Sequence, residues 1–224
     1  MRSFWGFYEN SQYRVGCNGG VVYVYDLNNK ELGKFKDLKY AYVGAFQPGS
    51  NVFVLKSTEG SLAVYDLDKI ELIRKIVVTK NGAQDEGFAF SPDGKYFYNI
   101  EKPKTSLRTR LTVYRTSDYT AEKVLFEEEE TMFMEALEFD RNTGEAYVLG
   151  FMRNADGVID YGFIGRFDGE RVYRIKRLER ERYNYISAYK SWEQAGCTAK
   201  KLEWSRMKTY EERPPVALKQ EYEK

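Results

Sequence analysis

Histidine is absent from the 224-residue sequence, which contains only two cysteines, Cys17 and Cys197. Without histidine there is no Ser-His-Asp or Cys-His catalysis, no histidine-based zinc site and no histidine pH switch. The two cysteines lie far apart and match no metal-ligand spacing. Unless the fold brings them together, we expect two free, buried thiols in a reducing compartment. We expect neither a metal nor any other cofactor.

Long apolar runs are also lacking, so we expect no signal peptide and no membrane-spanning segment. The 35 basic residues nearly balance the 34 acidic ones, which gives a formal net charge of +1. A chain with this balance has no net electrostatic attraction to nucleic acid or to an anionic membrane. We therefore expect a cytoplasmic protein that makes no membrane contact, and the charge argues against a nucleic-acid partner.

Aromatic residues are abundant, with 19 tyrosines and 14 phenylalanines, and these residue types favour strands. Five short segments alternate apolar residues with small ones and end on an aromatic side chain, at Phe7, Phe46, Phe90, Phe139 and Tyr189. A turn and further strand-like segments follow the first four. Each of these repeats therefore reads as four antiparallel strands in about 40 to 50 residues, the period of a β-propeller blade.

Turn chemistry marks the same repeats. The segment 91–94, Ser-Pro-Asp-Gly, predicts a tight turn between two strands, because proline presets one turn position and glycine accepts a positive φ. Asp26, Asp66 and Asp168 recur near the ends of the third strands. An aspartate there accepts hydrogen bonds from nearby backbone N–H groups, so we interpret all three as turn caps.

The Phe-Ser-Pro-Asp-Gly-Lys turn at 90–95 and the Val-Tyr-Asp-Leu strand ends at 24–27 and 64–67 resemble WD40-like and YVTN-type β-propeller repeat proteins. The resemblance covers residues 3 to about 178 and one further strand, and it concerns the fold rather than any particular member. It implies a ring of blades with little indication of function. The Gly-His dipeptide of the strictest WD40 repeats is missing, since the chain has no histidine.

The sequence thus predicts an all-β chain, with residues 1–224 forming a single β-propeller domain. The expected repeats are 3–36, 40–78, 85–127 and 133–178, with a degenerate fifth at 183–213. We expect five blades, the last irregular or partly helical. The alternative is four blades followed by a C-terminal helical cap. Both a monomer and a dimer are compatible with the sequence.

In propellers of this kind, the residues at which the innermost strands begin face the central channel, and ligands usually bind there. The repeat alignment places Tyr42, Glu86, Glu135 and Tyr185 at these positions, together with Ser3. No set of catalytic residues is recognisable. We therefore expect a non-enzymatic binding module, a protein-interaction scaffold. The first alternative is a carbohydrate-binding or carbohydrate-active propeller that uses these carboxylates and tyrosines.

Two charged runs complete the candidates. The acidic run 127–130 is interpreted as a solvated loop rather than a cation site. The basic run 171–182 is interpreted as a protected outer strand that pairs with acidic neighbours. Its alternative function is nucleic-acid contact through phosphates, which a second basic stretch at 102–115 would extend.

Overall fold

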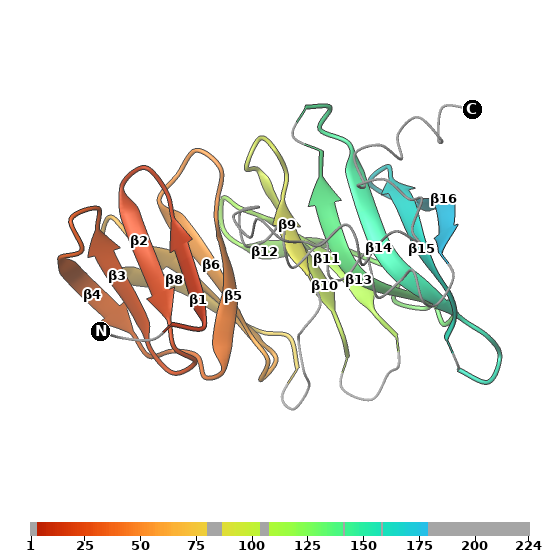
Figure 1. Cartoon of the computed structure of the whole chain (residues 1–224), viewed down its shortest axis with the longest axis horizontal. Helices are drawn as coiled ribbons and strands as arrows, with labels where there is room; N and C mark the ends of the chain where they lie inside the picture. The colour runs from red at the N-terminus through yellow and green to blue at the C-terminus, as the bar shows by residue number, and fades with distance from the viewer. Residues whose placement is uncertain (1–3, 80–86, 104–107, 141, 158, 179–224) are drawn as a thin grey trace, which may run out of the picture. The chain divides into compact units, whose positions relative to one another are not determined.

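The computed structural model describes residues 4–79, 87–103, 108–140, 142–157 and 159–178. In these ranges the chain forms sixteen strands, arranged as four separate four-stranded antiparallel sheets (Figure 1). Within each sheet, strands that follow one another in the chain are neighbours. The prediction of an all-β chain built from four-stranded repeats is confirmed.

The first sheet contains β1 (Gly6–Glu9), β2 (Tyr13–Cys17), β3 (Val22–Asp26) and β4 (Glu31–Phe35). The second sheet contains β5 (Ala41–Phe46), β6 (Val52–Ser57), β7 (Ser61–Asp66) and β8 (Glu71–Val77). The third sheet contains β9 (Phe88–Phe90), β10 (Tyr96–Glu101), β11 (Arg110–Arg115) and β12 (Thr120–Leu125). The fourth sheet contains β13 (Met132–Phe139), β14 (Ala146–Arg153), β15 (Ile159–Phe167) and β16 (Val172–Leu178).

The chain divides into two compact units, Met1–Glu128 and Glu129–Lys224. The first unit holds the first three sheets, and the second unit holds the fourth. The predicted fifth repeat, 183–213, lies outside the described residues.

The three predicted aspartate caps are confirmed. Asp26 Oδ1 accepts hydrogen bonds from the backbone N–H groups of Asn28 and Lys30, both at 2.9 Å. Asp66 and Asp168 accept corresponding pairs of backbone hydrogen bonds in their own turns. Each cap closes the turn that leads into the outermost strand of its sheet.

Each outermost strand also carries a register shift against its neighbour. The shifts fall at comparable places, between Val24 and Tyr25, Val64 and Tyr65, Val113 and Tyr114, and Ile164 and Gly165. A bulge at this position bends the edge strand and discourages edge-to-edge pairing with another sheet.

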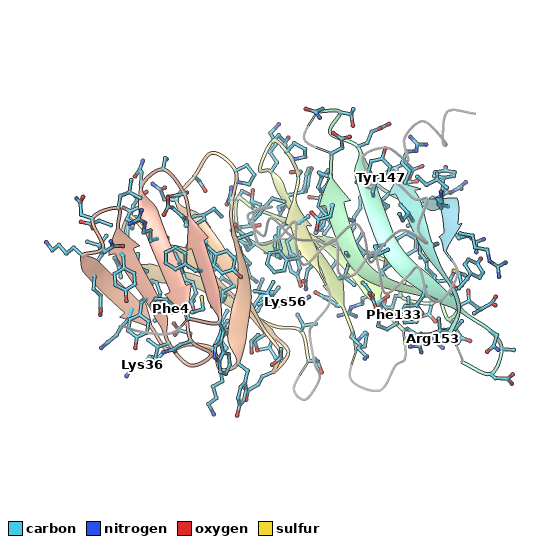
Figure 2. The ribbon with its side chains drawn as sticks, viewed as in Figure 1. Phe4, Lys36, Lys56, Phe133, Tyr147 and Arg153 are labelled. Carbon is cyan, nitrogen blue, oxygen red and sulfur yellow. The ribbon has the colours of Figure 1, made fainter. Side chains whose placement is uncertain are left out.

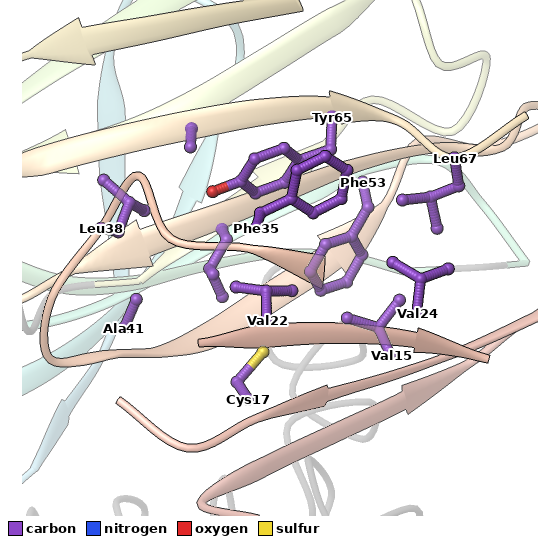
Figure 3. Close-up of a cluster of buried hydrophobic side chains, with 12 residues drawn as sticks. Val15, Cys17, Val22, Val24, Phe35, Leu38, Ala41, Phe53, Tyr65 and Leu67 are labelled. Carbon is purple, nitrogen blue, oxygen red and sulfur yellow. The ribbon is translucent and has the colours of Figure 1, made fainter. Parts of the chain in front are cut away.

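The core of the first unit lies between the faces of successive sheets. Between the first and second sheets, Val15, Val24 and Phe35 pack with Phe53 and Tyr65, all buried (Figure 3). The Phe35 and Tyr65 rings stack with their centroids 4.1 Å apart. Cys17 lies in the same cluster as a free, buried thiol, as predicted, whereas Cys197 is outside the described residues.

A second cluster joins the second and third sheets. Val54, Leu62 and Val64 pack against the aromatic side chains of the third sheet (Phe90, Phe97, Tyr114 and Tyr119). In the second and third sheets, the side that meets the preceding sheet is therefore rich in aromatic residues. In the first and second sheets, the side that meets the following sheet is largely aliphatic.

Candidate functional site on the first sheet

The first sheet presents an aromatic cluster on the face directed away from the second sheet. Side chains alternate along a strand, so the burial of Val15 and Val24 against the second sheet directs Gly16, Tyr23 and Tyr25 to the opposite face. Phe7 is the register partner of Gly16, which in turn pairs with Tyr23. We call this surface, made of Phe4, Phe7, Gly16, Tyr23 and Tyr25, the aromatic face.

Phe4 lies at the centre of the aromatic face. Its ring centroid is 6.1 Å from that of Phe7, 6.1 Å from that of Tyr23 and 6.3 Å from that of Tyr25. A Cβ atom built on Gly16 would lie 2.6 Å from the Phe4 ring. Glycine at this position therefore lets the Phe4 ring lie directly on strand β2.

The aromatic face is open to solvent. Phe7 is 53% exposed, and Phe4, Tyr23 and Tyr25 are partly exposed. Trp5, the residue after Phe4, is 63% exposed and packs against Gly19. Large aromatic side chains are mostly buried in folded domains, and a cluster of exposed ones commonly marks an interaction surface.

Strand register changes the alignment of the first repeat. In the second sheet, Phe46 pairs with Phe53 and Phe53 with Tyr65. In the third sheet, the corresponding row is Phe90, Phe97 and Tyr114. In the first sheet, this row consists of Glu9, Arg14 and Tyr25. The predicted equivalence of Phe7 with Phe46 and Phe90 is therefore wrong by two residues, and Glu9 occupies that position.

Glu9 and Arg14 form an ion pair in place of an aromatic pair. Arg14 Nε lies 2.6 Å from Glu9 Oε2, while Arg14 Nη1 donates to the Leu27 carbonyl at 2.8 Å and to Asn29 Oδ1 at 2.9 Å. In the second and third sheets, the corresponding Phe46–Phe53 and Phe90–Phe97 ring centroids are 5.0 Å apart. One end of the aromatic face is thus charged and exposed to solvent. We call this end, formed by the Glu9–Arg14 ion pair, the rim.

The turn before the outermost strand also differs between the first sheet and the next two sheets. Asn29, Ile70 and Tyr119 each have a positive φ in the turn before the outermost strand. Ile70 packs over Gly33 of the first sheet, and the Tyr119 hydroxyl donates to Gln47 Oε1 of the second sheet at 2.7 Å. Asn29 instead bonds Arg14 within its own sheet. Ile70 and Tyr119 each contact the preceding sheet from this turn position, whereas the first sheet has the polar residue Asn29 there.

A second group of polar residues is buried between the second and third sheets. Lys56 is 2% exposed and its Nζ donates to the Ile100 carbonyl at 2.8 Å (Figure 2). Glu101, which is 1% exposed, accepts hydrogen bonds from the Tyr114 hydroxyl at 2.7 Å and from Arg110 Nε at 2.9 Å. Burial, and then the Glu101 carboxylate, raise the pKa of Tyr114 well above its ordinary value.

This buried polar group lies close in the backbone to one predicted channel position, Tyr42. Lys56 pairs with Val43, the residue after Tyr42, and the Ile100 N–H donates to the carbonyl of Gly87. Sequence reasoning missed this buried polar group, although the sequence contains a signal for it. Phe97, Asn99 and Glu101 alternate along β10, so the burial of Phe97 places the other two side chains on the same buried face.

The predicted channel residues are placed only in part. Tyr42 belongs to β5 in the first unit, and Glu135 lies in β13 of the second unit, at the register shift between Met134 and Ala136. Glu86 and Tyr185 lie outside the described residues. A shared opening lined by all four therefore stays a prediction.

The acidic and basic runs are largely paired at the positions that are described. Glu127 bonds Arg110 at 2.8 Å and Glu128 lies 3.6 Å from Arg108, so part of the 102–115 stretch is neutralised. In β16, Arg174 donates to the Tyr161 hydroxyl at 2.8 Å, and the Arg177 guanidinium lies 4.1 Å from the Tyr161 ring centroid. These contacts favour structural roles for both runs. For the basic run, they favour a structural role over phosphate binding.

Within the described ranges, no helix has the length and apolar character needed to cross a bilayer. The same residues contain no group of three or more cysteine, aspartate or glutamate side chains placed to hold a metal ion.

Comparison with known structures supports the fold. Hydrazine synthase of Kuenenia stuttgartiensis aligns with 73% of this chain and 50% of its own, with a TM-score of 0.57 and 15% identity. The WD40 domain of Toxoplasma gondii coronin aligns with 78% of this chain and 45% of its own, with a TM-score of 0.57 and 11% identity. No protein-family model matches the sequence, and no curated protein is similar to it.

The chain thus spans about half the length of the solved structures that it matches. Its four-stranded antiparallel sheets and these similarities define a WD40-like propeller fold. At 15% identity or less, the similarity concerns the fold alone.

Proposed function

We propose that this chain is a non-enzymatic propeller module that binds protein through the aromatic face of its first sheet. The observation that carries the proposal is the 53% exposure of Phe7 within a cluster of aromatic rings on an ordered sheet.

The composition of the aromatic face supports protein as the ligand. Protein–protein interfaces are enriched in aromatic residues and arginine, with an apolar centre and a polar rim. Here Phe4, Phe7 and Tyr23 form the centre, and the Glu9–Arg14 ion pair forms the rim. Phe7 and Tyr23 lie on strands β1 and β3, so little backbone conformational entropy is lost at these two rings when a partner binds.

Affinity capture from native extract tests this function with matched variants. Phe7→Asp places a charge in the centre of the aromatic face, where binding would have to desolvate it. Val77→Asp is the control, because Val77 is 59% exposed on β8 of the same unit. We expect partner proteins to be retained by the wild type and by Val77→Asp and lost with Phe7→Asp. Equal retention by all three, or no retained protein, would refute the proposal.

A further inference from the structure

We propose that the aromatic face binds an acidic segment of its partner protein, in which carboxylates lie beside an aromatic or large aliphatic side chain. This inference rests on the proposed function and names the chemistry that the same surface recognises. It combines two features of the first sheet. The centre of the aromatic face is apolar, and two exposed lysines, Lys34 and Lys36, lie beside that centre. We call these two residues the lysine end.

Strand register places the lysine end on the aromatic face. Lys34 of β4 is the register partner of Tyr23, and register partners lie on the same side of a sheet with their Cβ atoms about 5 Å apart. Phe35 is directed to the opposite side, where its ring stacks on Tyr65. Side chains alternate along an extended chain, so Lys36, directly after the end of β4, follows Lys34 on the aromatic side.

The lysine end is not neutralised within the described part of the chain. Both lysines are exposed, and no described carboxylate forms an ion pair with Lys34 or Lys36. At the rim, by contrast, Arg14 is already paired with Glu9. Glu31, the register partner of Tyr25, adds a further carboxylate on that side of the face. The unpaired positive charge of the aromatic face is thus concentrated at the end away from the rim.

A partner that covers the apolar centre must also satisfy Lys34. Covering Tyr23 removes water from the neighbouring Lys34, and burying an ammonium group without an opposite charge is costly. Carboxylates of the partner offset this cost and steer the encounter, whereas a basic segment is repelled. Because Glu9 and Glu31 lie toward the rim, the acidic residues of the partner must lie on the lysine side of its apolar anchor.

The size of the aromatic face suits a short segment rather than a folded domain. Strands β1 to β4 contain four or five residues each. With a strand spacing of about 4.8 Å and a rise of about 3.3 Å per residue, the face measures roughly 15 Å on each side. Interfaces between folded proteins bury about 800 Å² per partner, which is more than this face offers. An extended segment of about five residues spans it.

Peptide display against the purified full chain tests the chemistry of the ligand. Random peptides of about twelve residues, long enough to cross the face and extend beyond it, are displayed on phage and selected on the wild-type protein. We expect the selected peptides to combine an aromatic or large aliphatic residue with a cluster of aspartates or glutamates. Synthetic copies should bind the double variant Lys34→Glu, Lys36→Glu about tenfold more weakly, because each reversal replaces an attraction with a repulsion.

Lys123→Glu is the matched control. Lys123 is an exposed lysine on β12, the outermost strand of the third sheet, and it forms no ion pair with another described residue. This variant should bind the selected peptides as the wild type does. Circular dichroism and the thermal unfolding midpoint identify any variant that has lost its fold. If the double variant does not fold, Lys34→Gln with Lys36→Gln removes the same charges and should weaken binding in the same direction.

The other outcomes overturn the inference. These are the selection of no peptide, selected peptides without an acidic bias, and equal binding by the wild type and the double lysine variant. Tighter binding of single-stranded oligouridine than of the acidic peptides would assign the aromatic face to nucleic acid instead. Capture from extract judges the proposed function separately. A Phe7-dependent partner that the double lysine variant retains as well as the wild type leaves that function standing and refutes the acidic ligand.

Discussion

The guanidinium of Arg14 and the carboxylate of Glu9 lie 2.6 Å apart at the register position where the next two sheets each hold a pair of phenylalanines. The interior pairs are part of the apolar contacts that join one sheet to the preceding one. In the first sheet the ion pair keeps this end of the face hydrated. The neighbouring aromatic rings remain partly exposed to solvent.

Truncating interior and exposed aromatic residues should have different consequences for stability. Phe97 is fully buried between the second and third sheets, so Phe97→Ala should lower the free energy of unfolding by about 3 to 5 kcal/mol. Phe7→Ala should lower it by less than about 1 kcal/mol. Urea unfolding followed by near-ultraviolet circular dichroism measures both. Similar losses would mean that Phe7 is packed like an interior residue.

Glu101 should matter more than its neighbour Glu127, although both bond Arg110. Glu101→Gln weakens a buried pair and the hydrogen bond from Tyr114, so we expect a loss of about 3 kcal/mol. Glu127 is 56% exposed, and Glu127→Gln should cost less than about 1 kcal/mol. The same urea titrations decide this, and equal losses would show that the Glu101 site is hydrated.

Cys17 should remain protonated and unreactive at neutral pH. Burial raises the pKa of its thiol from 9.0 to about 12. Because the folded-state pKa is the higher one, the stabilisation is fully present below pH 9 and is lost as the pH rises toward 12. Iodoacetamide labelling, with the Cys17 peptide quantified by mass spectrometry, should proceed only after unfolding. Rapid labelling of the native protein at pH 8 would contradict the burial of this thiol.

Gly16→Ala should weaken binding while leaving the fold intact. The added Cβ would lie 2.6 Å from the Phe4 ring, so the ring must move away from the centre of the aromatic face. Gly20→Ala is the matched control, since a Cβ there has no heavy atom within 4 Å. We expect reduced capture for Gly16→Ala alone, with thermal midpoints near the wild-type value for both. Unchanged capture would show that the position of Phe4 is irrelevant to binding.

Sequence reasoning found the strands, the aspartate caps and the repeat type, because these depend on local alternation and turn chemistry. It misplaced the first repeat because a shift of two residues along a strand keeps every side chain on the same face. Phe7 and Glu9 both face outward, and only the pairing of Glu9 with Arg14 identifies the equivalent position. The Lys56–Ile100 hydrogen bond joins two sheets, so no local pattern predicts it.

The most direct test of the central claim, that the aromatic face binds protein, is site-specific photocrosslinking. A benzophenone amino acid is placed at position 7 in one protein and at position 77 in another, and both are irradiated in cells. We predict a discrete crosslinked protein adduct from position 7 and none from position 77. No adduct from position 7, or the same adducts from both positions, would contradict the account.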